Sequence, residues 1–174
     1  FSSPSLLATG PQAQTASSTG ELKRIADQLA ANGDHEAAIP IYRHLGARSG
    51  DPAALGALAN SLIALGVNEE ATSILAMLIE RGQANGAVWY SLGKTQLANG
   101  HFEEALTAFN NAATQMGVDP KIRSGKAIAL AALGRTGEAL AAFQKETDRL
   151  TLSNKALILA ATGNADTATW MLEL

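Results

Sequence analysis

Apolar residues recur along this chain at intervals of three and four, the spacing that places side chains on one face of an α-helix. One such run contains Trp89, Leu92, Gly93 and Leu97 and ends at Gly100. A second run follows the glycine directly and consists of Phe102, Ala105, Leu106, Phe109 and Ala113. The pattern predicts two helices joined by a tight glycine turn.

The same arrangement recurs along the chain. A glycine is followed five residues later by alanine and nine residues later by a large residue with an apolar body. The other sets are Gly33/Ala38/Tyr42, Gly66/Ala71/Leu75, Gly134/Ala139/Phe143 and Gly163/Ala168/Leu172. The glycines are 33, 34, 34 and 29 residues apart. A period in this range indicates a repeat protein whose helix pairs stack, because neither helix can bury its apolar face alone.

The residue types at the helix ends agree with this division. Glycine suits the turn because it adopts the left-handed conformation without a Cβ clash, and the small alanine lets the two helices approach closely. Asp51-Pro52 and Asp119-Pro120 each precede a predicted first helix. Aspartate caps a helix N-terminus, and proline is favoured at the first helical position.

The periodicity separates a lead-in, residues 1–18, from a repeat domain, residues 19–174. The lead-in carries no charge and has little periodicity, so we expect a flexible segment that is either a frayed terminus or a tether. Ser18 and Glu21 have capping-box spacing, which predicts that the first helix begins there. The expected repeat units span about 19–51, 52–84, 85–118, 119–147 and 148–174.

Trp89, Leu92 and Gly93, followed by Ala105 and Phe109, resemble the tetratricopeptide repeat (TPR), whose pattern begins W-x-x-L-G and continues to A-x-x-x-F. The chain departs from that pattern at several positions, such as Gln96 in place of the usual tyrosine. The resemblance implies an all-α, right-handed superhelical solenoid of about five helix–turn–helix repeats. It also implies that the first helices line a concave groove for a partner protein or peptide.

The amino-acid composition argues against several classes of function. Hydrophobic residues make up 47% of the chain but aromatic residues only 5%, so the core must consist largely of alanine, leucine and isoleucine. The net charge of −3 argues against binding to nucleic acid. No uncharged apolar run is long enough to span a membrane. The absence of cysteine excludes thiol catalysis, disulfides and cysteine-ligated metals.

The sequence contains no recognisable catalytic or metal-binding pattern. His35 and His44 are nine residues apart, neither has a carboxylate at zinc-site spacing, and His101 simply follows a turn glycine. Glu103 and Glu104 fall in the first turn of a predicted helix, where carboxylates suit the positive end of the helix dipole. We therefore predict a protein that is not an enzyme and that binds no cofactor or metal.

The resemblance to the TPR assigns candidate groove residues by the number of residues that separate them from each turn glycine in the sequence. Positions three, six and ten residues before the glycine should face the concave side. The candidates for partner binding at these positions are Lys23, Asp27, Asn60, Ile63, Tyr90, Lys94, Leu97, Ser124, Ile128 and Leu157. The N-terminal half of this set is polar and the C-terminal half more apolar, which favours an amphipathic helix or strand as ligand. The alternative is that small residues there only allow tight helix packing.

The stretch from Ser153 to Gly163 is similar to the last repeat of the Tad (tight adherence, Flp pilus) assembly TPR lipoproteins, in which an asparagine precedes a Leu/Ala run and a glycine. The alanine-rich units and the Ser/Thr/Gln lead-in are similar as well. This resemblance implies a pilotin-like lipoprotein at the periplasmic face of the bacterial outer membrane, with a secretin subunit as partner. The chain starts at Phe1, so we expect any lipid anchor to lie upstream, and the membrane would be reached only through it.

Other identities remain open at this point. One is a general TPR adaptor or co-chaperone with another protein client, in the cytoplasm or the periplasm. Some TPR co-chaperones hold a terminal carboxylate with lysine, asparagine and arginine. Here Lys23 matches the first basic position, but Asp27 replaces the expected asparagine and would repel the ligand. Two further alternatives are a regulatory docking module of a longer protein and self-association through the C-terminal helix.

Overall fold

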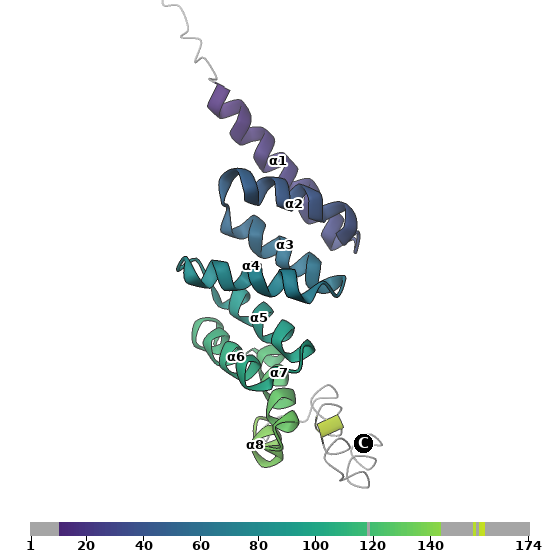
Figure 1. The fold of residues 1–174 in the computed structure, drawn as a ribbon, viewed down its shortest axis with the longest axis vertical. Coiled ribbons are helices and arrows are strands. Elements are labelled where there is room, and N and C mark those ends of the chain that lie inside the picture. The colour runs from purple at the N-terminus through teal and green to yellow at the C-terminus, as the bar shows by residue number, and fades with distance from the viewer. Residues whose placement is uncertain (1–10, 118, 144–154, 156, 159–174) are drawn as a thin grey trace, which may run out of the picture. The chain divides into compact units, whose positions relative to one another are not determined.

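The computed structural model describes residues 11–117, 119–143, 155, 157 and 158, and within these ranges the chain forms helices and no strand (Figure 1). The helices follow one another in the order α1 (Pro11–Ala31), α2 (His35–Ser49), α3 (Pro52–Ala64), α4 (Asn68–Glu80), α5 (Gly86–Ala98), α6 (Phe102–Met116), α7 (Pro120–Ala132) and α8 (Thr136–Ala141). The all-α fold class and the succession of helix–turn–helix pairs are therefore as predicted. Most of the expected fifth unit, 148–174, lies outside the described residues.

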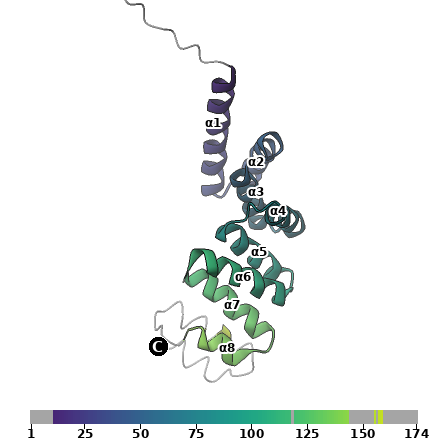
Figure 2. The same cartoon turned by 90° about the vertical axis from the view of Figure 1, so that its left-hand side faces the viewer.

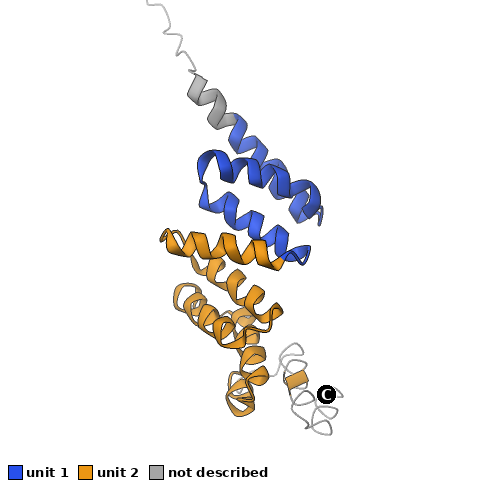
Figure 3. Ribbon diagram, in the orientation of Figure 1, with its two compact units in different colours: residues 1–67 blue, residues 68–174 orange. Residues whose placement is uncertain are grey.

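The chain divides into two compact units, residues 1–67 and residues 68–174 (Figure 3). In the first unit, α2 packs against both α1 and α3. In the second unit, each helix from α4 to α8 packs against the next, and α5 also contacts α7 (Figure 2). Within the second unit, the first helices of two consecutive repeats, α5 and α7, thus lie next to each other.

Glycine forms the turn inside each described helix pair, as predicted. Gly33, Gly66, Gly100 and Gly134 have φ angles between 75° and 85°, in the left-handed region. At the third of these turns, the amide of His101 donates to the carbonyl oxygen of Gln96 at 2.9 Å, which satisfies a carbonyl group at the helix end. The structure shows a further regularity that the repeat spacing does not predict. Glycine also has positive φ, between 61° and 76°, at the turns that lead to the next pair, at Gly50, Gly82 and Gly117.

The predicted Asp-Pro helix starts are confirmed. The Asp51 carboxylate accepts a hydrogen bond from the amide of Ala53, and Pro52 is the first residue of α3. The Asp119 carboxylate likewise accepts from the amide of Lys121 at 2.7 Å, at the start of α7. These side chains satisfy amides that have no partner inside the helix, so each fixes the residue at which its helix begins.

The predicted lead-in, residues 1–18, is corrected in its second half. Helix α1 begins at Pro11, so residues 11–18 are helical, and the Ser18–Glu21 pair lies inside the helix instead of starting it. Proline costs little at the first helical position because its missing N–H would have no partner there. The alanine and glutamine residues that follow Pro11 favour a helix, but the serine and threonine residues among them do not, so helix preference alone does not explain this extension.

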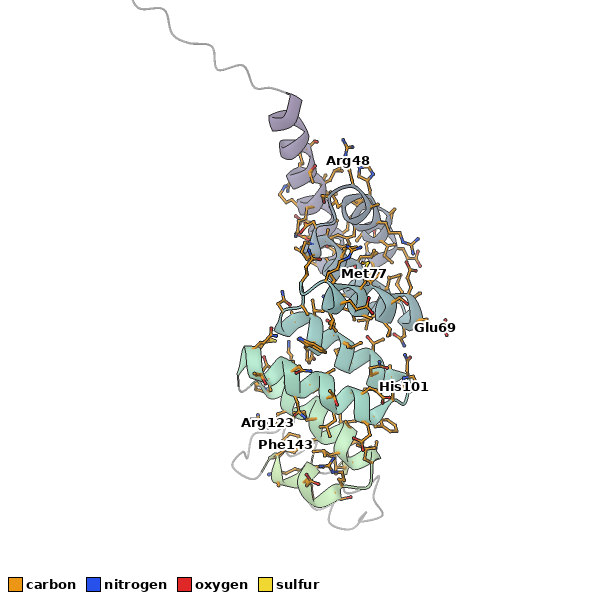
Figure 4. The ribbon with its side chains drawn as sticks, turned by 60° about the vertical axis from the view of Figure 1, so that its left-hand side comes forward. Arg48, Glu69, Met77, His101, Arg123 and Phe143 are labelled. Carbon is orange, nitrogen blue, oxygen red and sulfur yellow. The ribbon has the colours of Figure 1, made fainter. Side chains whose placement is uncertain are left out.

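The core of each unit combines small alanines with large side chains. In the first unit, Tyr42, Leu45 and Leu62 are buried with the fully buried alanines Ala26 and Ala38. In the second unit, the core cluster consists of Ala105, Leu106, Phe109, Ala112, Ile122, Ala127, Ala129, Leu130, Ala139, Phe143 and Ile158. Phe143 follows α8 and is labelled in Figure 4. The predicted alanine and large apolar positions of the described repeats are thus core positions.

Candidate functional site

Helices α5 and α7 present the predicted groove residues of the second unit on facing surfaces. Tyr90, Lys94 and Leu97 lie on α5, and their steps of four and three residues place them along one side of the helix. Ser124 and Ile128 lie on α7, one turn apart. Because α5 and α7 contact each other, these five residues come together although up to 38 positions separate them in the sequence.

A pocket of about 340 Å³ lies between the two helices, and all five of these residues line it. The remaining lining residues are Phe109 from α6 and Pro120, Lys121 and Gly125 from α7. We call this cavity the α5–α7 pocket. Its walls are mostly apolar, and the side chain of Ile128 is 40% exposed. The pocket can therefore take up an apolar side chain and shield its wall from water.

The floor of the pocket is an aromatic ring held between two glycines. Phe109 is 0% exposed, and its ring centre lies 5.9 Å from that of Tyr90 with the planes tilted by 53°. A Cβ atom added to Gly93 of α5 would lie 2.7 Å from the Phe109 ring, and one added to Gly125 of α7 would lie 2.5 Å from it. Both distances are shorter than any real contact. Helices α5 and α7 can therefore approach the ring this closely only because Gly93 and Gly125 have no side chain.

The roles of Phe109 and Gly125 in the pocket do not follow from the repeat pattern. That pattern predicts Phe109 only as a large apolar core residue and predicts no function for Gly125. A usable signal was present, because a glycine inside a helical pattern often marks a close approach of another group. Gly93 gives the same signal, in addition to matching the family pattern.

Two lysines line the pocket, one from each of the facing helices. The Lys94 ammonium group lies 5.9 Å from the centre of the Tyr90 ring, within the range of a cation–π contact, and Lys121 lines the pocket from α7. None of the lining residues carries a carboxylate. Burial raises the pKa of the Tyr90 phenol, and the negative charge of the nearby Asp119 raises it further. Tyr90 therefore stays a neutral hydroxyl group that can both donate and accept a hydrogen bond.

The candidate residues of the first unit form a different arrangement. Lys23 and Asp27 lie on α1, and Asn60 and Ile63 lie on α3, which contacts α1. The Lys23 ammonium group and the Asp27 carboxylate form an ion pair at 2.7 Å. The hydroxyl of the buried Tyr42 donates to the same carboxylate at 2.8 Å. Two intramolecular partners therefore hold Asp27, and Lys23 is paired as well.

The pKa values of this network follow from its geometry. Burial acts to raise the pKa of Asp27, but the hydrogen bonds from Lys23 and Tyr42 and the charge of Lys23 outweigh it, so the pKa is lowered. Burial raises the pKa of the Tyr42 phenol, and its hydrogen bond to Asp27 and the charge of Asp27 raise it further. The ionised carboxylate and the neutral phenol are thus the forms that the folded unit favours.

Replacing Tyr42 with phenylalanine is expected to lower the free energy of unfolding at neutral pH by about 0.5–1.5 kcal/mol, because one hydrogen bond is lost. The folded chain holds the phenolic proton more tightly than the unfolded chain does. The stabilisation that the Tyr42 hydroxyl provides is therefore complete below about pH 10 and is lost as the pH rises above that value. Urea unfolding of both proteins at neutral and alkaline pH should show the difference between them shrinking above about pH 10. A difference that stays constant would contradict the assigned hydrogen bond.

The tenth candidate, Leu157, is one of the few described residues near the C-terminal end and is 63% exposed. In the described part of the chain, no group of three or more histidine, cysteine, aspartate or glutamate side chains could hold a metal ion. No described helix is long and apolar enough to cross a bilayer. The α5–α7 pocket brings together five of the ten predicted groove residues.

Comparison with known proteins gives two matches to family models and several similar structures. Two models of the tetratricopeptide repeat match residues 29–95 and residues 90–151. Among solved structures, MamA from Desulfovibrio magneticus RS-1 (from residue 41 to its end) has a TM-score of 0.76 at 14% identity, covering 89% of this chain and 91% of that one. No curated protein matches the chain.

Two further solved structures are described as TPR proteins. YrrB, described as having an unusual peptide-binding site, has a TM-score of 0.69 at 22% identity, covering 87% of this chain and 81% of that one. A thermophilic protein of Thermus thermophilus has a TM-score of 0.70 at 22% identity, covering 88% of this chain and 87% of that one. At these identities the likeness concerns the fold.

Proposed function

This chain is a tetratricopeptide repeat protein, and we propose that it acts as a non-enzymatic scaffold that binds a partner protein through the α5–α7 pocket. Repeat proteins of this kind typically present such surfaces for protein interaction. The observation that carries the proposal is the convergence of five predicted groove residues on one apolar pocket. The peptide-binding site named for the structurally similar YrrB supports the same class of ligand.

The geometry of the pocket favours a short peptide segment as the bound element. A volume of about 340 Å³ is near the lower end of the range for ligand pockets, so it accommodates one or two side chains and not a folded domain. The apolar lining supplies the free energy of burial, and Tyr90 adds a hydroxyl group that can orient a peptide backbone. A partner would therefore insert an anchoring side chain from an extended or helical segment.

For the identity of the partner, we propose a secretin subunit of a Tad/Flp pilus, with the chain acting as a pilotin-like assembly factor. The support is the resemblance of the stretch from Ser153 to Gly163 to the last repeat of that lipoprotein family. The proposal includes a location at the periplasmic face of the outer membrane, reached through an upstream lipid anchor. Calorimetry of the intact chain with peptides from the C-terminus of a secretin tests it, and the absence of binding would remove the pilotin function.

Replacing Ile128 with glutamate is expected to weaken partner binding by roughly tenfold or more, because a charged carboxylate would have to be buried in the apolar pocket. Ile128 is the best position for this test because its side chain is already 40% exposed, so the unbound fold can keep the glutamate in water. Tyr90 and Leu97 are less suitable, since both pack against the core cluster. Pull-down of the partner by both proteins, together with circular dichroism, measures binding and fold.

Val67→Glu provides the matched control. Val67 is an exposed apolar residue in the turn between α3 and α4, and it does not line the pocket. A glutamate there lies just before the N-terminus of α4, where its charge is tolerated. If both variants lost binding equally, the effect would come from added charge in general and the pocket would not be the binding site.

A further inference from the structure

We propose that the α5–α7 pocket selects a peptide segment in which a large apolar side chain stands beside one or more carboxylates. This inference rests on the proposed function, since it specifies the chemistry of the segment that the pocket receives. It is carried by the combination of an apolar cavity with two lysines at its edge, one from each of the facing helices.

The apolar part of the preference follows from the lining. Tyr90, Leu97 and Ile128 form the walls, Pro120 stands at the start of α7, and the Phe109 ring forms the floor. A large aliphatic or aromatic side chain would fill this cavity and remove the exposed surface of Ile128 from water, whereas alanine or serine would leave most of it empty.

The acidic part follows from the charge around the cavity. Lys94 on α5 and Lys121 on α7 both line the pocket and are exposed, and the lining contains no carboxylate. Within the described ranges, neither ammonium group forms an ion pair. The Lys94 ammonium group instead makes a cation–π contact with the Tyr90 ring. A carboxylate next to the inserted side chain would find two cations in reach, whereas a basic segment would bring like charges together.

The acidic group nearest the pocket does not reverse this preference. Asp119 lies close enough to Tyr90 to influence its pKa, so it contributes negative charge in this region. Its carboxylate, however, accepts the amide hydrogen of Lys121 at the N-terminus of α7, where the helix dipole offsets its charge. The chain as a whole carries a net charge of −3, so attraction of an acidic segment has to come from these local lysines.

A peptide array tests the inference with the whole chain as the probe. The array holds octapeptides with tryptophan, leucine, alanine or serine at the centre and aspartate, lysine or serine on both sides. The strongest peptide is then labelled and titrated by fluorescence anisotropy. We expect acid-flanked tryptophan and leucine peptides to bind best, and we expect binding to weaken as salt rises from about 0.05 M to about 0.5 M.

Lysine variants assign the preference to the pocket. Lys94→Ala and Lys121→Ala should each weaken binding of the acid-flanked peptide by about two- to fivefold, as expected for exposed charge pairs, and the double variant by about tenfold. Lys126→Ala is the matched control, because Lys126 lies on the same helix but does not line the α5–α7 pocket. Its affinity should equal that of the unmodified protein.

The outcomes separate this inference from the proposed function. The inference would be overturned if peptides bound regardless of their flanking charge and the lysine variants had no effect. If Ile128→Glu nevertheless abolished binding, the pocket would remain a binding site. Binding that survives Ile128→Glu would place the ligand elsewhere and overturn both. Failure of every peptide in the array to bind would overturn the inference.

Discussion

Replacing Phe109 with alanine is expected to lower the free energy of unfolding by about 3–5 kcal/mol, the usual cost of removing a fully buried aromatic side chain. The ring is 0% exposed and lies between Gly93 and Gly125, which carry no side chains that could close around the space left behind. The loss should therefore fall in the upper part of that range. Urea unfolding followed by circular dichroism measures it.

Phe102→Ala on the same helix is the control for this substitution. Phe102 is the first residue of α6 and is only half-buried, so its removal should cost clearly less. A loss for Phe109→Ala that is no larger than the loss for Phe102→Ala would show that the ring is not the centre of the second unit. Loss of the ring should also deepen the α5–α7 pocket and change its ligand preference.

Replacing Gly125 with alanine is expected to destabilise the protein by about 1–3 kcal/mol, although alanine is the better helix former. The added Cβ atom would lie 2.5 Å from the Phe109 ring, so either the ring or helix α7 must move. The same substitution at Gly56 of α3 meets nothing within 4 Å, so Gly56→Ala should instead stabilise by about 0.5–1 kcal/mol. Urea unfolding of the two variants should thus give changes of opposite sign.

The cause of the Gly125 effect can be isolated in a double-mutant cycle. If the clash is with the ring, Gly125→Ala should cost much less in a Phe109→Leu background, because the smaller side chain leaves room for the methyl group. An unchanged cost in that background would mean that Gly125 is required for a reason other than its approach to Phe109.

Much of the fold could be predicted from the sequence because the repeat is encoded locally. The turn glycines, the Asp-Pro helix starts and the alanine that follows each turn act within a few residues of their own position. Counting back from Gly100 and Gly134 was also enough to find five residues of the pocket, since a helix places positions three or four apart on one side.

The parts that could not be predicted depend on contacts between distant segments or on weak local preferences. The fit of Phe109 between Gly93 and Gly125 involves three helices and has no local pattern. The start of α1 at Pro11 does not follow from the sequence, because residues 11–18 lack apolar periodicity and include Thr15, Ser17 and Ser18, whose helix preference is low. The pairing of Asp27 with Tyr42 was missed because an offset from a glycine gives the position of a carboxylate and not its partner.

The positive-φ glycines at both kinds of turn keep neighbouring helices separate. A sequence so rich in alanine could continue a helix through a connection and fuse two neighbours into one straight rod, which would leave their apolar faces without a partner. At seven described positions, from Gly33 to Gly134, the backbone is in a conformation that no right-handed helix can contain. Each helix therefore has to end at or before such a glycine, and this gives the segments the separate lengths that stacking requires.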